Sequence, residues 1–408
     1  MTDHLDYLLA AVEPVAPFGL SLLDAWGLAL SEDIRSEADL PSAPVAEVDG
    51  YAFAVEDASA VPGARPSLTR ADAVDGDPAG RIVRIGEAVP VKAGETLPQG
   101  ADTVVANWQV AHDDTTNPPT VKLRSKVQAG DWVRPIGSEA QAGELLAKAG
   151  TMLNDRRSAL LAAAGFNRVL AHLRTRFAVV QVTDADNPAP HDGDRAPGAG
   201  AHLINGAARA DGAAAIRVRI DLTDLPRARD HLNDELSRAD MMVTIGGMTE
   251  AGADPRLLTL LNGMGTVDVV TVAMRPGQRH GFGKVGDDSI PVLLLPSDPP
   301  ALLAAYHAFA RPVMRKLMGA QPFAHEPMLC YAERDMDAEP GVTEIVPCRL
   351  RQDGNRYFAS EITPRRHAFL PTLVAADALV LLPGDKGRVF AGEALAAWLL
   401  TDPRIVTQ

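Results

Sequence analysis

A glycine turn between two apolar runs is the part of this chain best suited to chemistry. The segment "VTIGGMTEAGAD" (243–254) has an apolar run, then the pair Gly246 and Gly247, and then Asp254 ahead of a further apolar stretch. This order predicts a buried strand, a tight turn and a helix that begins near Asp254. Because backbone N–H groups at a helix start attract anions, the turn is a candidate seat for a phosphate or an oxoanion.

Asp49 is a second acid in a position that could serve chemistry. It lies in "PSAPVAEVDGYAFA" (41–54), directly before Gly50 and an alternating apolar run. An Asp-Gly pair is by itself a turn signal, so these residues alone leave a structural and a functional role open. Other motifs of the chain are needed to distinguish the two roles.

The overall composition narrows the class of protein. With 408 residues the chain exceeds the usual size of one domain, and its net charge of −14 disfavours nucleic acid as a partner, because nucleic-acid binding needs basic surfaces. Cys330 and Cys348 are too few for a zinc site or a disulfide framework. We therefore expect buried structural thiols in a reducing compartment.

Localisation is predicted from the absence of two signals in the sequence. No apolar run reaches the roughly 18 to 20 residues that a membrane-spanning helix needs. The start, "MTDHLDYLLAAVEPV" (1–15), carries acids in place of a basic flank, which predicts an amphipathic helix and not a signal peptide. We expect a cytoplasmic protein.

The N-terminal part combines helical and β-type patterns. Apolar residues recur at three- and four-residue steps in "LDYLLAAV" and "LSLLDAWGLAL", so 1–36 is expected to form two helical segments. Short alternating stretches separated by Gly, Pro, Asp and Asn predict a β-rich region over 40–135. A helix is expected over 151–170, with Gly165 as its C-terminal cap.

An α/β pattern follows. We expect strands at 176–182, 215–220, 241–245, 267–274 and 291–296, and helices near 201–214, 226–238, 254–262 and 299–318. The alternation predicts a mostly parallel sheet, whose ligand crevice lies at the carboxyl ends of the strands. The segment 186–200, rich in Pro, Gly and Asp, predicts a mobile loop at one of these ends. Short alternating pieces beyond residue 325 predict a small C-terminal β-barrel.

Longer stretches of the chain resemble a known family. "LLDAWGLALSEDIRSEADLPSAPVAEVDGYA" (22–52) is similar to the N-terminal signature of the molybdopterin molybdenumtransferase family, which includes the gephyrin E domain. Further pieces recur in the family's order: "LPQGADTVV" (97–105), "GDWVRPIGSEAQAGELLAKAGTML" (130–153), "IGGMTEAGAD" (245–254), "MRPGQRHGFGKV" (274–285), "LLPSDPPA" (294–301) and "VAADALVLLPGDKGRVFAGE" (374–393). Their collinear order over nearly the whole chain is more specific than any single piece.

The resemblance implies a fold, a reaction and a set of domains. Members of the family are elongated homodimers that insert molybdenum from molybdate into adenylylated molybdopterin, using a divalent cation such as magnesium and releasing AMP. Four domains are then expected: a helical linker and dimerisation domain (1–36 and 136–170), a β-rich domain (37–135), a molybdopterin-binding α/β domain with a mostly parallel sheet (171–324) and a C-terminal β-barrel domain (325–408).

By the same resemblance, three acids are expected to be catalytic: Asp49, Glu139 and Asp254. Asp49 matches the aspartate of the family's Ser-Met-Asp-Gly-Tyr-Ala motif, Glu139 the aspartate of Gly-Glu-Asp, and Asp254 the acid that closes the Gly-Gly-hydrophobic-Ser loop. Asp49 and Asp254 are also the expected metal ligands, since a hard cation takes oxygen donors. The positions expected to bind the substrate are Arg134, Gly246, Gly247, Thr249, Arg275, Ser297 and Asp298.

Several positions depart from the family pattern. Acids stand at or beside expected anion contacts at Glu47, Glu95, Glu250 and Asp298. In addition, Ala93 lacks a hydroxyl and Ala185 lacks a carboxylate that the family has there. Each uncompensated like charge in a pocket of low dielectric constant weakens the binding of a phosphate-rich substrate by about 1 kcal/mol or more.

Two functions of different class therefore stand side by side. The first is molybdate insertion by a molybdenumtransferase. The second is a non-catalytic, gephyrin-like dimeric scaffold that binds a short peptide of a cell-division, cytoskeletal or membrane protein in a groove near 300–320 and the barrel from 328 onward. An inactive member that pairs with an active one is a third possibility.

Overall fold

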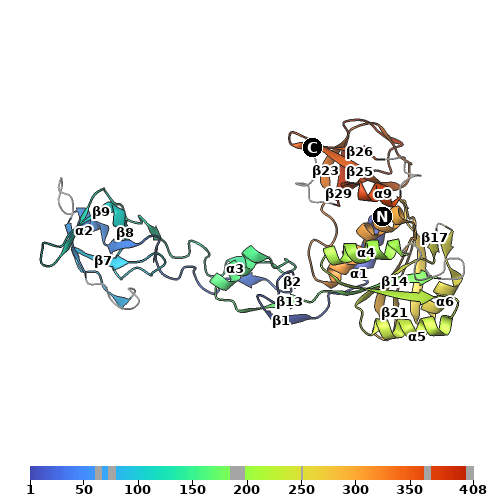
Figure 1. Ribbon diagram of the computed structural model, residues 1–408, viewed down its shortest axis with the longest axis horizontal. Coiled ribbons are helices and arrows are strands. Elements are labelled where there is room, and N and C mark those ends of the chain that lie inside the picture. The colour runs from blue at the N-terminus through green and yellow to red at the C-terminus, as the bar shows by residue number, and fades with distance from the viewer. Residues whose placement is uncertain (60–66, 72–79, 184–197, 250, 363–368, 401–408) are drawn as a thin grey trace, which may run out of the picture. The chain divides into compact units, whose positions relative to one another are not determined.

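The computed structural model describes residues 1–59, 67–71, 80–183, 198–249, 251–362 and 369–400. The chain divides into two compact units (Figure 1). Unit 1 consists of Met1–Glu32, Ala149–Asp155 and Arg168–Gln408, and unit 2 of Asp33–Lys148 and Arg156–Asn167. Among the described residues, no helix is both long and apolar enough to cross a lipid bilayer.

Unit 2 is built on a curled, mixed sheet. Its strands run in the order β8 (Thr103–Ala106), β5 (Gly50–Phe53), β7 (Glu87–Val91), β6 (Ser67–Arg70), β10 (Thr120–Leu123) and β9 (Val110–Asp113). Short elements complete it: β3 (Ile34–Arg35), β4 (Val45–Ala46), α2 (Val55–Ser59), η2 (Asn107–Gln109), β11 (Val133–Arg134) and β12 (Leu145–Ala147). Alternating residues such as Tyr51 and Phe53 form the apolar core. The β-rich region predicted over 40–135 is confirmed.

The helix α3 (Asp155–Ala163) ends where the sequence predicts a glycine cap. Gly165 has φ = +89°, its N–H donates to Ala162 O (3.0 Å), and the N–H of Phe166 donates to Leu161 O (2.9 Å). These are the two hydrogen bonds of a Schellman motif, and they satisfy carbonyl groups that the helix end leaves unpaired. The cap is confirmed, but the predicted helix is shorter than 151–170, because the chain passes into the strand β13 (Arg168–His172).

The N-terminal part of unit 1 contains one predicted helix and lacks the other. Helix α1 (Thr2–Ala10) is present, whereas residues 22–28 of "LSLLDAWGLAL" form a turn between β1 (Pro17–Ser21) and β2 (Ala29–Leu30). Both strands pair with β13. The Ser21 hydroxyl accepts the N–H of Asp24, and Gly27 has φ = +74°. A local turn and a long-range strand pairing thus outweigh the helical periodicity, and the second helix was a wrong prediction.

The central sheet of unit 1 has the strand order β15 (Ala214–Asp221), β14 (Arg176–Thr183), β16 (Met241–Ile245), β22 (Ile290–Leu295), β21 (Arg279–Val285) and β19 (Gly265–Thr271). The first four strands are parallel to one another, and β21 and β19 are antiparallel to their neighbours. The mostly parallel sheet is therefore confirmed, with an antiparallel edge that makes it mixed.

Strand β21 was not predicted from the sequence. Its glycines lower the β propensity, but a Cβ atom at Gly283 would lie 2.0 Å from Thr266 O, so the close pairing with β19 requires glycine there. The strand expected over 267–274 also ends early, at Thr271. Met274 and Arg275 form a separate strand, β20, that pairs with β25 (Thr343–Asp353).

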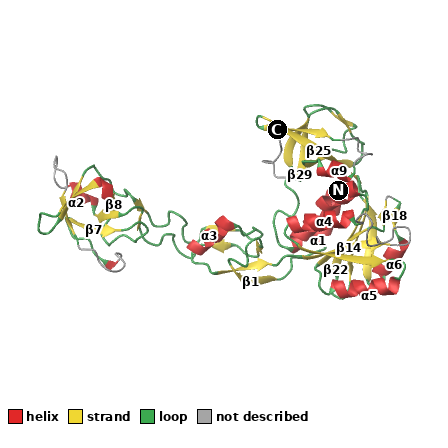
Figure 2. Cartoon of the chain, viewed as in Figure 1, coloured by secondary structure: helices red, strands yellow, loops and turns green. Residues whose placement is uncertain are grey.

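Helices cover both faces of the central sheet (Figure 2). On one face lie α1, α4 (Ala199–Ala210) and a continuous helical segment formed by α7 (Pro299–Ala305), the π-helical turn η3 (Tyr306–Ala310) and α8 (Arg311–Leu317). On the other lie α5 (Leu225–Leu236) and α6 (Pro255–Asn262). The carboxyl ends of the parallel strands remain open to loops, as the α/β pattern predicts.

The C-terminal part of unit 1 is the predicted β-barrel. Strands β25, β26 (Arg356–Glu361), β23 (Met328–Ala332), β29 (Ala394–Leu399) and β27 (Ala378–Leu382) pair in this order, and β27 also pairs with β25, which closes the barrel. The short elements β24 (Met336–Asp337), α9 (Leu370–Val374) and β28 (Arg388–Val389) connect them. Cys330 and Cys348 are buried in the barrel core.

Candidate functional site

The glycine turn after β16 is fixed by close packing. Gly246 and Gly247 have φ values of +95° and +71°. A Cβ atom would lie 2.8 Å from Val182 O at Gly246 and 2.7 Å from Leu257 Cδ2 at Gly247. The backbone conformation and the lack of space both require glycine, so the turn brings β16, β14 and α6 together at the carboxyl edge of the sheet.

Between this turn and helix α6 the structure has a feature that the sequence did not predict. A small hairpin of β17 (Met248–Thr249) and β18 (Gly252–Ala253) separates the glycines from the helix. A cavity of about 420 Å³ lies beside it, lined by Val182, Gly246, Gly247, Thr249, Ala251, Gly252, Ala253, Asp254, Pro255 and Ser297. The loops after β16 and β22 therefore share one cavity at the predicted edge.

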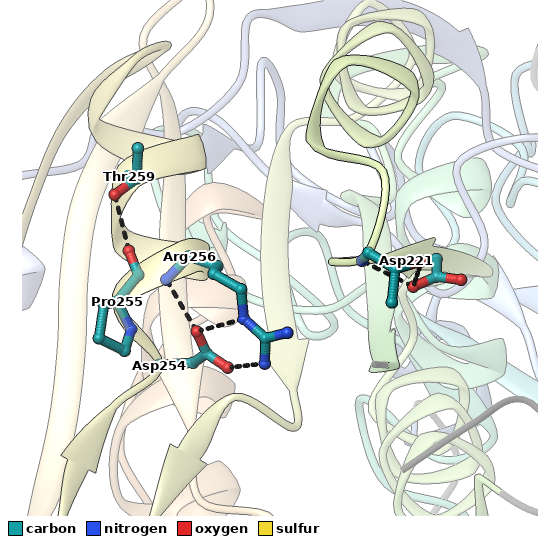
Figure 3. A network of polar contacts seen from close by, with 6 residues as sticks. Asp221, Asp254, Pro255, Arg256 and Thr259 are labelled. Carbon is teal, nitrogen blue, oxygen red and sulfur yellow. Dashed lines mark hydrogen bonds and ion pairs between the residues drawn. The ribbon is translucent and has the colours of Figure 1, made fainter. Parts of the chain in front are cut away.

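Asp254 caps helix α6 and forms an ion pair (Figure 3). Its Oδ1 accepts the N–H of Arg256 (2.7 Å), and its two carboxylate oxygens accept hydrogen bonds from Arg256 Nε (3.1 Å) and Nη2 (2.6 Å). The hydrogen bond from the Arg256 side chain is the main cause that lowers the pKa of Asp254. Both carboxylate oxygens thus accept hydrogen bonds from Arg256, and a metal ion at Asp254 would compete with this guanidinium.

A second cavity of about 420 Å³ adjoins the first, because Thr249 and Ser297 line both. Its other walls are Met248, Pro276, Gly277, Gln278, Arg279, Pro296, Asp298 and Ala301. The Ser297 hydroxyl donates to Met248 O (3.1 Å) and that of Thr249 to Gly252 O (3.2 Å). Asp298 caps helix α7, since its Oδ2 accepts the N–H of Ala301 (3.3 Å).

Arg279 is the residue of this site that the sequence did not single out. It begins β21, lines the second cavity, and has a buried Nε with no hydrogen-bond partner. A Cβ atom at Gly252 would lie 3.8 Å from its Nη1, so the guanidinium also reaches the hairpin. Within the described part of the chain, Arg279 has no ion pair. A cation that lines a cavity and has no ion pair among the described residues is suited to an anionic ligand.

Arg275, which the sequence did single out, has a different environment. It lies on β20, about half exposed, and forms an ion pair with Glu339. Neither of the two cavities described above is lined by Arg275. The motif "MRPGQRHGFGKV" therefore contains residues that line the second cavity, but its first arginine forms an ion pair with an acid of the same chain.

Unit 2 holds the other predicted site residues. Asp49 is exposed, and its Oδ1 accepts the N–H of Ala93 (2.8 Å). Arg134 and Glu139 form an ion pair of 2.7 Å with side chains 45% and 40% exposed, so solvent screens it. These three residues belong to one unit, and the glycine turn, Thr249, Asp254, Ser297 and Asp298 belong to the other.

The two expected metal ligands, Asp49 and Asp254, do not belong to a cluster of ligands among the described residues. The described part of the chain contains no group of three or more His, Cys, Asp or Glu side chains placed to hold an ion. Of the two expected ligands, Asp254 is occupied by Arg256, and Asp49 uses one carboxylate oxygen for Ala93. Ala185, Glu250 and 186–197 of the predicted mobile loop lie outside the described residues.

Comparison with known proteins gives the family. Residues 1–165 match the MoeA N-terminal region (domain I and II), and residues 330–400 match the MoeA C-terminal region (domain IV). Molybdopterin molybdenumtransferase 1 of Mycobacterium tuberculosis is 28% identical over 94% of this chain and 94% of its own. The molybdopterin molybdenumtransferase of Bacillus subtilis is 23% identical over 94% of this chain and 90% of its own.

A solved structure has the same fold. The molybdopterin biosynthesis moeA protein from Pyrococcus horikoshii OT3 superimposes with a TM-score of 0.75 at 21% identity, and 98% of each chain is covered. The two matching regions lie in the family's order at the two ends of the chain and together span more than half of it. The chain belongs to the MoeA family.

Proposed function

We propose that this protein is a molybdopterin molybdenumtransferase, which inserts molybdenum from molybdate into adenylylated molybdopterin. The observation that carries the proposal is Arg279 in the cavity at the carboxyl ends of β16 and β22, whose buried Nε has no hydrogen-bond partner among the described residues. The relatives with this name in Mycobacterium tuberculosis and Bacillus subtilis match the chain over nearly its full length, which supports the same activity here.

The cavity suits a tetrahedral oxyanion. Molybdate and the phosphates of the second substrate both present several oxygen acceptors. Arg279 offers guanidinium donors, including the buried Nε, and Thr249 and Ser297 each hold a hydroxyl in a long hydrogen bond to a backbone carbonyl. Charge-assisted hydrogen bonds from an arginine to an oxyanion are stronger than such neutral contacts, so an anion that enters the cavity would be held mainly by Arg279.

The three acids that were expected to be catalytic have different roles in this proposal. Asp49 and Glu139 are the proposed acids of unit 2, and Asp49 keeps one carboxylate oxygen for a ligand. Asp254 shapes the cavity as a helix cap and places its charge against Arg256. Asp49 lies in unit 2 and Asp254 in unit 1, so neither unit contains both expected magnesium ligands. We therefore assign no step of the reaction to that ion.

A single-turnover assay tests the proposal. Excess protein, adenylylated molybdopterin, magnesium and molybdate should yield AMP in a molybdate-dependent manner. Arg279→Met should slow the release at least about tenfold, because it removes the charge from the cavity and keeps the side-chain length. Lys284→Met, at an exposed position of the same strand outside both cavities, is the matched control. Equal rates for wild type and Arg279→Met would refute the role of Arg279.

Two ion pairs favour the second candidate function, a non-catalytic dimeric scaffold. Asp254 is neutralised by Arg256 and Arg275 by Glu339, although both were expected to act on substrate or metal. We propose this alternative for the case in which the folded protein neither binds the pterin nor releases AMP. Light scattering should then show a homodimer. A defined peptide from a cell-division, cytoskeletal or membrane protein should bind the full chain, with no effect of molybdate.

A further inference from the structure

Two tryptophans form an exposed pair on unit 2. Trp108 is 62% exposed and Trp132 is 40% exposed, and their ring centroids lie 6.0 Å apart with the planes at 82°. In this edge-to-face arrangement the edge of one ring packs on the face of the other, and both indoles keep much of their surface exposed. Exposed indoles are costly in water, so a pair of them in contact calls for a reason.

Trp132 has a backbone conformation that is rare for a bulky residue. Its φ is +54°, in the left-handed region, where a side chain with a Cβ atom is strained. Three hydrogen bonds hold it there: Trp132 O accepts the N–H of Glu47 (2.9 Å), the next N–H, of Val133, donates to Gly130 O (3.2 Å), and the indole Nε1–H donates to Gln109 Oε1 (3.2 Å). Strain of this kind is typical of positions where a side chain is placed for function.

The polar atom of Trp132 is already satisfied. Gln109 Oε1 accepts both the indole N–H and the backbone N–H of Ala106 (3.3 Å), which ties the ring to the end of strand β8. What the ring still offers to a ligand is its π face, in a fixed position. A partner would therefore have to be flat, because stacking is the contact that such a face makes.

Two acidic residues, Glu47 and Asp49, lie on segments that are hydrogen-bonded to those of the tryptophans. Glu47 is bonded through its backbone to Trp132, and Asp49 through its backbone oxygen to the N–H of Asn107, the residue before Trp108 (3.2 Å). The Glu47 carboxylate is exposed and, among the described residues, has no hydrogen bond or ion pair. Asp49 uses one of its two carboxylate oxygens for Ala93. Backbone hydrogen bonds thus place both acidic residues beside the segments that carry the two tryptophans.

We propose that Trp108 and Trp132 form a stacking platform for a 2-amino-4-oxopteridine ring, with Glu47 as the acceptor for its edge. The amino group and the adjacent ring N–H of such a ring are neighbouring donors, which match the two oxygens of one carboxylate. Adenine presents a donor beside an acceptor on the corresponding edge, and this acceptor would face the negative charge. The platform therefore selects the pterin ring of the proposed substrate over its adenine ring, and in this respect the inference rests on the proposed function.

Equilibrium binding of 6-hydroxymethylpterin to the full-length protein, without molybdate or turnover, tests the platform. Trp108→Ala and Trp132→Gly should each weaken pterin binding about tenfold, since an aromatic stack contributes on the order of that factor or more. Glycine at 132 keeps the left-handed backbone conformation accessible, and the variant loses the ring together with its hydrogen bond to Gln109. Trp26→Ala, which removes a 57% exposed indole from unit 1, should leave pterin binding unchanged.

The role of Glu47 has its own measurement. Glu47→Gln should weaken the binding of the pterin about tenfold and leave the binding of AMP unchanged, because only the pterin edge uses both carboxylate oxygens. Thermal unfolding of each variant checks that it is folded. If pterin binds equally to wild type and to both tryptophan variants, or does not bind wild type at millimolar concentration, the platform is excluded. If AMP binding falls instead of pterin binding, the selectivity is wrong.

The result is separable from the test of the proposed function. A protein that binds the pterin through the tryptophans but releases no AMP would keep the platform and lose the transferase. A protein that releases AMP with the same KM in wild type, Trp108→Ala and Trp132→Gly would keep the transferase and lose the platform.

Discussion

At the scale of single residues, Asp254 shows how a predicted catalytic acid can serve the fold. It follows a glycine turn of the kind that binds phosphate, but its carboxylate caps α6 and forms an ion pair with Arg256, two residues later. Replacement by alanine should lower the free energy of unfolding by about 1–2 kcal/mol, because a cap and an ion pair are lost together. Chemical denaturation measures this directly, and Asp254→Asn, which keeps an acceptor for the cap, should lose less.

The pH dependence of this effect follows from the direction of the shift. Arg256 holds the pKa of Asp254 below its ordinary value of 3.8, so the ion pair stabilises the folded state above that pH. This stabilisation is lost as the pH falls through the lowered pKa. The difference between wild type and Asp254→Asn should therefore be constant near neutral pH and shrink below pH 3.8. A difference that grows on acidification would contradict the assignment.

Gly246 allows a sharper test of the turn itself. Gly246→Ala combines a left-handed φ with a Cβ atom 2.8 Å from Val182 O, whereas Gly392→Ala has φ = +84° and no atom within 4 Å. Both should destabilise the protein, and Gly246→Ala by about 1–3 kcal/mol more, because backbone atoms must move. The difference between the two variants in denaturant unfolding isolates the close contact. Equal losses would mean that the turn relaxes freely.

At the scale of elements, the helical segment 299–317 carries the buried His307, which contacts the partly buried His325 beyond the end of the segment. Its π-helical turn places His307 Nδ1 2.8 Å from His325 Nε2, and His325 stacks on Trp398 of the barrel. Burial, with the nearby charge of Arg311, lowers the pKa of both histidines to about 3. The same segment places Tyr306 and Arg311 on the carboxylate of Asp211.

These histidines should make the stability of the protein fall on mild acidification. In the unfolded chain they bind protons near pH 6.5, but in the folded state only near pH 3, so stability is complete above 6.5 and decreases between 6.5 and 3. His307→Gln does not titrate there and should reduce the slope of unfolding free energy against pH by about 1 kcal/mol per pH unit. Denaturant unfolding at pH 7, 6 and 5 measures the slope. The same slope for wild type and variant would show that His307 is not buried in its neutral form.

The elements also show what the sequence can and cannot predict. Strands β14, β15 and β16 and helices α5 and α6 follow from clear periodicity, because both ends of each element carry local signals such as the caps Asp224 and Asp254. The turn after Ser21 and strand β21 do not follow from periodicity. Their conformations depend on pairing in the folded chain, of β1 with β13 and of β21 with β19. A local sequence pattern does not show which strand will pair with which.

The site was predictable to a similar extent. The glycine turn, Thr249, Ser297 and Asp298 meet at two adjoining cavities, as the loops at the carboxyl ends of the strands predict. Arg279 was overlooked although it stands in the same motif as Arg275. Arg275 forms an ion pair because Glu339, 64 residues away, lies beside it in the fold, whereas Arg279 has no ion pair within the described residues; no spacing in the sequence shows this difference.

At the scale of the whole molecule, the division into two units predicts separate unfolding. Each unit has its own buried core, with Phe53 in unit 2 and Phe177 in unit 1, both fully buried. A phenylalanine-to-alanine change in a core costs about 3–5 kcal/mol, and this loss should stay within the unit that carries it. Phe53→Ala should lower the melting temperature of one transition, and Phe177→Ala that of the other.

The four tryptophans of the chain report on this division, because Trp108 and Trp132 lie in unit 2 and Trp26 and Trp398 in unit 1. With Trp108 and Trp132 replaced by phenylalanine, the fluorescence follows unit 1 alone, while calorimetry follows both units. In that background, Phe53→Ala should shift a calorimetric transition and leave the fluorescence transition in place. A shift of both together would mean that the units unfold as one cooperative body, and a ligand bound to either would then stabilise the whole chain.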